Sequence, residues 1–209
     1  MDIIKLTLNF ISTTDKSLFL TGKAGTGKTT FLNALRQNIY KKCIVVAPTG
    51  IAAINANGVT IHSFFNLPLG PFLPGKSQLG TSIDSNKKKL IKELELLIID
   101  EVSMLRADTL DAIDYILRTT RKKEDVPFGD VQVLFVGDLC QLSPIIADEE
   151  WRQIKQYYKG INFLNALSIK IAPPVYLELT QVYRQTDDNF IQLLNQVRTG
   201  NCSRREVDL

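Results

Sequence analysis

The feature that most constrains this chain is the glycine-rich segment GKAGTGKT, which runs from Gly22 to Thr29. It fits the GxxxxGK[ST] pattern, and it lies between an apolar run at 17–21 and a segment of helical spacing at 29–40. Glycines let several backbone N–H groups converge on a phosphate, and the N-terminus of the next helix adds partial positive charge. The segment therefore predicts a strand, a phosphate-binding P-loop and a helix, in that order.

Two side chains of the predicted P-loop have distinct expected roles. Lys28 is expected to contact the β- and γ-phosphates of ATP, and the Thr29 hydroxyl to help hold Mg²⁺. An ordinary glycine-rich turn is the alternative, and the strand, helix and Lys-Thr pair together argue against it. The complete set of predicted nucleotide-binding P-loop residues is Gly22, Lys23, Ala24, Gly25, Thr26, Gly27, Lys28, Thr29 and Thr30.

Further apolar runs alternate with helical patterns along the chain. Strands are predicted at 43–47, 96–99, 131–136 and 175–179, and helices at 107–121 and 189–197. Continuous apolar strands separated by helices predict an α/β fold, with a parallel sheet flanked by helices on both faces. The stretch 66–89 is rich in proline and glycine and ends in three lysines. It predicts a short irregular insertion, either a small subdomain or a loop.

Two carboxylates, Asp100 and Glu101, follow the predicted strand 96–99 directly. The carboxyl ends of parallel strands form the edge of the sheet where ligands bind. Asp100 is therefore expected to hold Mg²⁺, and Glu101 to orient and deprotonate the attacking water. A solvated acidic turn is the alternative, which the upstream P-loop makes less favourable. The second carboxylate also argues against nucleotide kinases, whose acceptor is a phosphate rather than water.

Two later residues complete the predicted catalytic set. Gln141 follows the predicted strand 131–136, where its amide can hydrogen-bond the γ-phosphate or the attacking water. Arg184 precedes the predicted helix 189–197 and would offset transition-state charge. By spacing alone both signals are weak, and the alternatives are a capped loop for Gln141 and a surface position for Arg184.

Composition adds broad limits on the class of protein. The chain has 44% hydrophobic and 22% charged residues, as expected of a soluble globular protein, and a net charge of +3 permits nucleic-acid binding without requiring it. Cys43, Cys140 and Cys202 are odd in number and have no CxxC spacing, which argues against disulfides and zinc. No apolar stretch reaches membrane-spanning length. We therefore expect a cytoplasmic protein without a membrane partner.

Five segments in this order resemble the petite-integration-frequency (PIF) DNA helicases. They are GKAGTGKTT, VVAPTGIAAINANGVTIHSFF, LLIIDEVSML, VLFVGDLCQLSPI and LTQVYRQTDDNFIQLLNQVRTGN. That family comprises 5′-to-3′ members of helicase superfamily one related to RecD-like enzymes. The resemblance spans 18–201, and APTGIAA with TIHSFF is most telling because P-loop ATPases in general have no need of it. It implies a RecA-like P-loop NTPase domain that acts as an ATP-dependent DNA helicase.

The same resemblance implies contacts with single-stranded DNA. By resemblance, Lys28, Thr29, Asp100, Glu101, Gln141 and Arg184 take the roles given above, and the DNA contacts map onto Pro48, Thr49, Gly50, His62, Ser63 and Phe64. A turn after the strand 43–47, with hydroxyl and imidazole donors, suits phosphate contacts. Phe64 and Phe65 are candidates to stack on bases, although we expect at least one of them in the core. A purely structural role is the alternative for His62.

The sequence departs from the family pattern in two ways. Family members usually carry a glutamine before the P-loop to recognise adenine, but 1–20 contains none, so Asn9 is expected to substitute or adenine selectivity to be relaxed. The motifs also account for one motor domain, 1–209, and no second RecA-like domain is apparent in this chain. The sequence therefore predicts a monomeric first motor domain that binds Mg-ATP and single-stranded DNA weakly and hydrolyses ATP slowly.

Two other classes of protein fit parts of the sequence. A loader-type P-loop ATPase acting on a protein partner would carry a lid subdomain and would have no use for TIHSFF. A module that binds DNA under nucleotide control without turnover is the second alternative. The intact Lys28, Asp100 and Glu101 count against a natural loss of catalysis.

Overall fold

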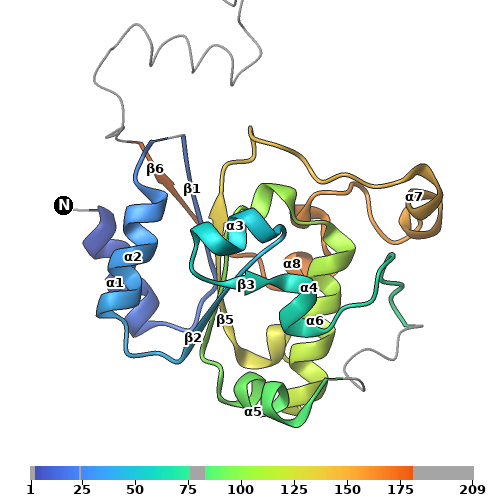
Figure 1. The fold of residues 1–209 in the computed structure, drawn as a ribbon, viewed down its shortest axis with the longest axis horizontal. Helices are drawn as coiled ribbons and strands as arrows, with labels where there is room; N and C mark the ends of the chain where they lie inside the picture. Colours follow the sequence, from blue (N-terminus) through green and yellow to red (C-terminus); the bar gives the residue numbers. More distant parts are fainter. Residues whose placement is uncertain (1–2, 24, 76–82, 181–209) are drawn as a thin grey trace, which may run out of the picture.

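Six parallel strands form one sheet in the computed structural model, which describes residues 3–23, 25–75 and 83–180 (Figure 1). The strand order across the sheet is β3-β2-β4-β5-β1-β6. The strands are β1 (Leu18–Gly22), β2 (Cys43–Ala47), β3 (Val59–Thr60), β4 (Leu96–Ile99), β5 (Gln132–Gly137) and β6 (Val175–Leu179). Every residue of β1, β4 and β5 is buried, as expected of central strands that are covered on both faces.

Helices cover both faces of this sheet (Figure 1). They are α1 (Ile3–Thr13), α2 (Lys28–Asn38), α3 (Gly50–Asn55), α4 (Ile61–Phe65), α5 (Ser85–Glu93), α6 (Ala107–Arg121), α7 (Asp148–Ile154) and α8 (Leu167–Ile171), with 3₁₀ turns at Val102–Met104, Pro127–Asp130 and Phe163–Asn165. Among these described helices, none is long and apolar enough to cross a membrane.

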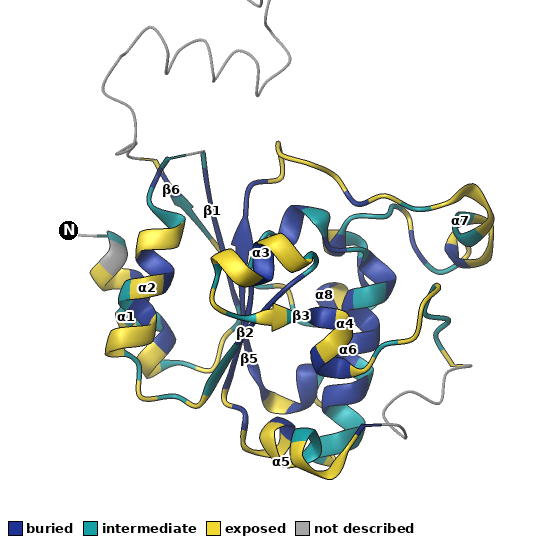
Figure 2. Ribbon diagram, in the orientation of Figure 1, coloured by how far each residue is buried: buried dark blue, intermediate teal, exposed yellow. Residues whose placement is uncertain are grey.

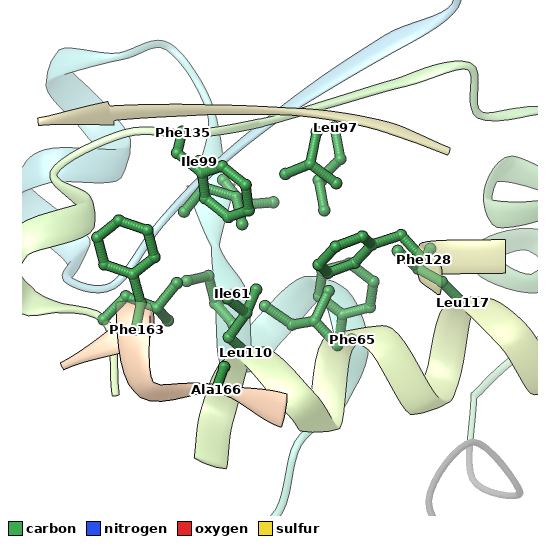
Figure 3. Packing of buried hydrophobic residues seen from close by; sticks show 14 of the residues in the cluster. Ile61, Phe65, Leu97, Ile99, Leu110, Leu117, Phe128, Phe135, Phe163 and Ala166 are labelled. Carbon is green, nitrogen blue, oxygen red and sulfur yellow. The ribbon is translucent and has the colours of Figure 1, made fainter. Parts of the chain in front are cut away.

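The two faces of the sheet bury separate hydrophobic clusters because side chains alternate along each strand. On β4, Ile98 belongs to the cluster under α1 and α2, whereas its neighbours Leu97 and Ile99 belong to the cluster under α4 and α6. Figure 3 shows the second cluster, in which Ile61 and Phe65 of α4 pack between the sheet and α6. This packing fixes the orientation of α4 and leaves His62 and Ser63 exposed.

The predicted architecture is confirmed, with differences at the ends of elements. The strands at 43–47, 96–99 and 175–179 and the helix at 107–121 have the predicted bounds. β3 was not predicted, since two residues carry no periodicity and the strand exists only through pairing with β2. The predicted helix at 189–197 lies outside the described residues.

The predicted irregular stretch 66–89 needs one correction at its C-terminal end. Residues 85–89 are helical and begin α5, because the side chain of Asp84 accepts a hydrogen bond from the Lys87 N–H at 2.9 Å and caps the helix. The sequence analysis took the lysines as the end of a loop and did not use this cap. Residues 76–82 lie outside the described part of the chain.

Candidate functional site

The P-loop connects the end of β1 to the start of α2. Gly25 and Gly27 have φ angles of 80° and 88°, a left-handed conformation that glycine adopts at little cost. A Cβ atom at Gly22 would lie 2.5 Å from Thr26 Oγ1 and 2.8 Å from the carbonyl oxygen of Leu179. The path of the P-loop backbone therefore requires glycine at positions 22, 25 and 27. Ala24 lies outside the described residues.

The side chain of Lys28 folds over this loop. Its ammonium donates hydrogen bonds to the carbonyl oxygens of Gly22 at 2.6 Å and Lys23 at 3.1 Å. Thr29 and Thr30 are exposed in the first turn of α2, so their hydroxyls are accessible at the helix N-terminus. The predicted P-loop side chains that are described thus lie together at the carboxyl end of β1.

The carboxylate pair lies at the end of β4, which is separated from β1 by β5 alone. The N–H of Asp100 bonds to the carbonyl of Val46 at 2.9 Å, and the Asp100 carboxylate accepts the N–H of Glu101 at 2.9 Å. Burial raises the pKa of Asp100, and the Glu101 charge raises it further. The positive charge of Lys28 lowers it, so these two side chains are close enough to interact. A bound cation would likewise offset the burial of the aspartate.

Glu101 adopts an uncommon backbone conformation. Its φ and ψ angles are 50° and 44°, in the left-handed region that non-glycine residues rarely occupy. The 3₁₀ turn Val102–Met104 follows immediately, and its backbone packs against Gly137 at the end of β5. A Cβ atom at Gly137 would lie 2.9 Å from the Val102 nitrogen. The carboxylate turn and the end of β5 therefore touch through backbone atoms.

Gln141 lies in a capped turn after β5. The buried Asp138 accepts the N–H of Cys140 on its carboxylate at 3.0 Å and the N–H of Gln141 on its carbonyl at 2.9 Å. The Gln141 side chain is exposed at the sheet edge. Because β5 lies between β4 and β1, this turn lies between the carboxylate pair and the P-loop. Arg184 lies outside the described residues.

A magnesium ion fits this donor set. Mg²⁺ is usually held by one or two carboxylates together with substrate phosphates and water, rather than by a protein cage. Asp100 supplies one carboxylate and Thr29 one hydroxyl, and the described residues contain no group of three or more His, Cys, Asp or Glu side chains that could hold a metal ion. The site therefore has the character of a metal–nucleotide site and not of a closed structural metal site.

The predicted DNA-contacting residues lie at the starts of two short helices, α3 and α4. Thr49 accepts the N–H of Ala52 on its hydroxyl at 3.2 Å and begins α3, and Thr60 accepts the N–H of Ser63 at 3.3 Å and begins α4. Pairing of β3 with β2 brings these helix starts to the same side of the sheet. His62 and Ser63 are exposed, Gly50 is exposed, and Pro48 and Thr49 are half-buried. The capping role of Thr60 was not predicted, although threonine is a preferred residue at the N-cap of a helix.

Phe64 requires a correction. Its side chain is 6% exposed and Phe65 is 0% exposed, and the two rings meet edge to face with centroids 4.8 Å apart. Both rings belong to the cluster under α4 and α6, so Phe64 is a core residue and offers no surface for base stacking. At least one of the two rings was expected in the core, and both lie there, because Phe64 and Phe65 are on the one buried face of α4.

Asn9, the candidate adenine-recognition residue, is exposed on α1. Its carbonyl accepts the Thr13 hydroxyl at 2.7 Å within the helix, and α1 packs beside α2. The side-chain amide is therefore accessible on the helix next to the P-loop helix. Its role stays a prediction.

The fold and the site define a class of protein, which is a P-loop NTPase with a RecA-like parallel sheet. Within that class the chain belongs to the PIF1-like helicase family, whose sequence model matches residues 2–208. The chain is 36% identical over 207 residues to the ATP-dependent DNA helicase PIF1 of Saccharomyces cerevisiae, covering 95% of this chain and 22% of that protein. It is 32% identical over 193 residues to the Homo sapiens PIF1, covering 90% and 28%.

Solved structures give the same assignment. A Pif1 structure that describes DNA unwinding at forked double-stranded DNA by two coordinating helicases matches with a TM-score of 0.94 and 45% identity, covering 100% of this chain and 50% of that one. The Bacteroides Pif1 bound to single-stranded DNA matches with a TM-score of 0.93 and 45% identity, covering 100% and 48%. The chain thus spans about half of these solved chains and about a quarter of the curated relatives.

Proposed function

We propose that this chain is the first motor domain of an ATP-dependent 5′-to-3′ DNA helicase, and that it binds Mg-ATP and single-stranded DNA. The observation that carries the proposal is that the P-loop with Lys28, after β1, and the Asp100 carboxylate, after β4, lie at the same carboxyl edge of one parallel sheet. An ammonium for phosphates and a carboxylate for Mg²⁺ are the two charges that a P-loop ATPase must bring together.

The proposed hydrolysis follows from these positions. Lys28 and the P-loop backbone bind the β- and γ-phosphates, while Thr29 and Asp100 would hold Mg²⁺, which neutralises phosphate charge when bound. Glu101 accepts a proton from the attacking water, and its strained backbone fixes the carboxylate next to Asp100. Gln141 orients the water or the γ-phosphate, and Arg184 offsets the developing charge.

The proposed DNA path begins at the two capped helix starts. Pro48, Thr49 and Gly50 lie at the start of α3, and His62 and Ser63 lie in the first turn of α4. Exposed hydroxyl, imidazole and backbone groups of this kind contact phosphates and sugars, which fixes the strand without reading its sequence. The Bacteroides relative is described as bound to single-stranded DNA, which supports this assignment.

We also propose that residues 1–209 act as half of a motor. Movement along a strand requires ATP-driven closure of two domains, so one domain is expected to bind its ligands but turn over slowly. A loader-type ATPase is not retained, since the chain belongs to the PIF1-like helicase family. A nucleotide-controlled DNA-binding module is the second candidate, favoured by the observation that the chain spans about half of the solved relatives.

Steady-state ATP turnover with and without oligo-dT tests the proposal, with Lys28→Ala as the blank. We expect little turnover, together with a rise in melting temperature on adding Mg-ATP and a further rise with oligo-dT. Turnover that increases strongly with DNA would show that the chain forms a complete catalytic site and would contradict the half-motor assignment. No response to either ligand would contradict the helicase assignment itself.

A further inference from the structure

Helix α5 carries an unusual concentration of positive charge. Its sequence SNKKKLIKE contains Lys87, Lys88, Lys89 and Lys92, here called the α5 lysine surface, and one glutamate. No acidic residue lies in the first turn, where negative charge would stabilise the helix dipole. Lys88 and Lys92 are also four residues apart, a spacing at which like charges repel. Lys92 lies in the last turn, where positive charge stabilises the helix dipole, but Lys87, Lys88 and Lys89 lie in the first half of the helix, where positive charge does not.

The acidic residues close to this surface are already engaged elsewhere. Glu93 pairs with the Lys42 ammonium at 3.1 Å, and Glu95 accepts the backbone N–H of Lys42 at 2.8 Å. Lys89 acts on Glu93 only at longer range. Within the described ranges 3–23, 25–75 and 83–180, no ion pair is formed by Lys88, Lys89 or Lys92. Their charges are available to an anion from outside the chain.

Lys87 joins this surface to the proposed DNA path. Its ammonium donates a hydrogen bond of 2.6 Å to the carbonyl oxygen of Ser63 on α4, one residue from His62. A carbonyl is neutral, so the bond positions the lysine without cancelling its charge. Figure 2 shows exposed residues on α5, and α4 lies between it and α3 in the same view. Lys87 therefore connects α5 directly to the helix that carries His62 and Ser63.

We propose that the α5 lysine surface is a further binding site for single-stranded DNA, in which the lysines contact backbone phosphates beyond His62 and Ser63. This inference rests on the proposed binding of single-stranded DNA. Lysine is a compact, strongly hydrated cation suited to phosphate contacts without base specificity. The site adds affinity and extends the length of strand that the domain covers.

The salt dependence of oligo-dT binding tests the site, measured by fluorescence anisotropy of a labelled strand. Each phosphate contact on a single strand adds about 0.7 to the slope of log affinity against log salt concentration. The triple variant Lys88→Ala, Lys89→Ala, Lys92→Ala is expected to lower that slope by roughly 1.5 to 2 for two or three lost contacts. Lys87→Ala, tested alone, is expected to lower it by about 0.7.

A matched control removes the same charge elsewhere. Lys155, Lys159 and Lys170 are exposed and lie on or beside α7 and α8, so their triple alanine variant lowers the net charge from +3 to neutral in the same way. The control is expected to keep the slope of the unaltered chain. Because the α5 lysines are peripheral to the cores, melting temperatures of both triple variants should match that of the unaltered chain within a few degrees, which excludes unfolding as a cause.

The outcomes distinguish failure of the α5 site from failure of the proposed binding of single-stranded DNA. Equal slopes in the two triple variants would overturn the α5 site while leaving DNA binding at 48–50 and 62–63 intact. No binding of oligo-dT by the unaltered chain would overturn the proposed function and the site together. Displacement of oligo-dT by a poly-glutamate peptide at equal charge concentration would assign the surface to an acidic protein instead of DNA.

Discussion

The carboxylate of Asp111 in α6 accepts two hydrogen bonds from Ser168, one from its N–H at 2.9 Å and one from its hydroxyl at 2.7 Å. It also accepts the N–H of Leu167 at 2.9 Å, so this buried side chain holds the start of α8. Asp108 holds the N–H of Phe72, and Asp114 holds the N–H of Phe128. Aspartates three residues apart on one helix face thus fix three distant segments.

Removing the Asp111 acceptor should destabilise the chain strongly. Asp111→Ala leaves three buried donors without a partner, and we expect a loss of about 3 kcal/mol in the free energy of unfolding. Asp111→Asn keeps one acceptor oxygen and should lose about 1 kcal/mol. Urea unfolding measures both, with the exposed Asp125→Ala as control. Similar losses for Asp111→Ala and Asp125→Ala would remove Asp111 from this role.

The stability contributed by Asp114 should depend on pH with a definite sign. Burial raises the pKa of Asp114 above its ordinary value of 3.8, although Arg118 and the Phe128 N–H act against the shift. Between the unfolded and the raised folded pKa, the folded chain holds a proton that the unfolded chain has lost. Stability therefore falls as pH rises through this interval and then levels off.

Asp114→Asn cannot ionise and should lack that decline. The stability difference between the unaltered chain and the variant is expected to shrink as pH rises above the ordinary aspartate pKa of 3.8. Urea unfolding at several pH values gives this difference directly. A difference that grows with pH would mean that Arg118 outweighs burial and that the folded pKa is lowered.

Much of the fold follows from the sequence because its signals are local. The apolar runs give the strands, and the P-loop pattern gives the turn between β1 and α2. Phe64 could not be placed, since burial of α4 depends on β4 and α6, which are remote from it in sequence. The aspartates of α6 gave no signal either, because Asp108 and Asp111 find partners 36 and 57 residues away.

Substitutions of Glu101 should lower ATP turnover, whereas replacement by glycine should also raise the free energy of unfolding. In a full-length protein that contains this motor domain, Glu101→Gln is expected to abolish ATP turnover and to keep the stabilisation by Mg-ATP, since the amide cannot accept the proton. Glu101→Gly is expected to raise the free energy of unfolding by up to about 1 kcal/mol, because glycine relieves the left-handed backbone.

Lys122→Gly provides the matched control for this trade-off. Lys122 has a φ of 57° at the end of α6, away from the P-loop, so it should gain similar stability with no change in turnover. Wild-type turnover in Glu101→Gln would remove Glu101 from the role of base. A lower free energy of unfolding in Glu101→Gly would show that contacts of the Glu101 side chain stabilise the fold by more than its left-handed backbone destabilises it.

Asn9→Ala should reduce the preference for ATP over GTP by about 3- to 10-fold, which is the loss of one hydrogen bond. The melting-temperature shifts with Mg-ATP and Mg-GTP measure this preference. Ser12→Ala, exposed on the same helix, is the control and should leave it unchanged. An unchanged preference in Asn9→Ala would reject the substitution of Asn9 for the usual glutamine.

Gly137→Ala should separate nucleotide binding from hydrolysis. The added Cβ would lie 2.9 Å from the Val102 nitrogen and 3.0 Å from its Cγ1 atom, so the turn that begins at Glu101 must move. The three atoms nearest to the added Cβ belong to Val102 and Ser103 rather than to the P-loop, so the Mg-ATP melting shift should be retained. Displacing a base by a few tenths of an ångström is expected to lower single-turnover hydrolysis by about 10- to 100-fold.

Two companion variants make this test decisive. Gly137→Ala combined with Val102→Ala removes the Cγ1 contact and should recover part of the rate, because the backbone contact alone remains. At Gly160 an added Cβ meets the side chain of Asn165 at 2.9 Å, which can rotate away, so Gly160→Ala should behave like the unaltered chain. If Gly137→Ala lowers the Mg-ATP shift as much as the rate, the contact supports the whole fold of the site rather than the position of Glu101.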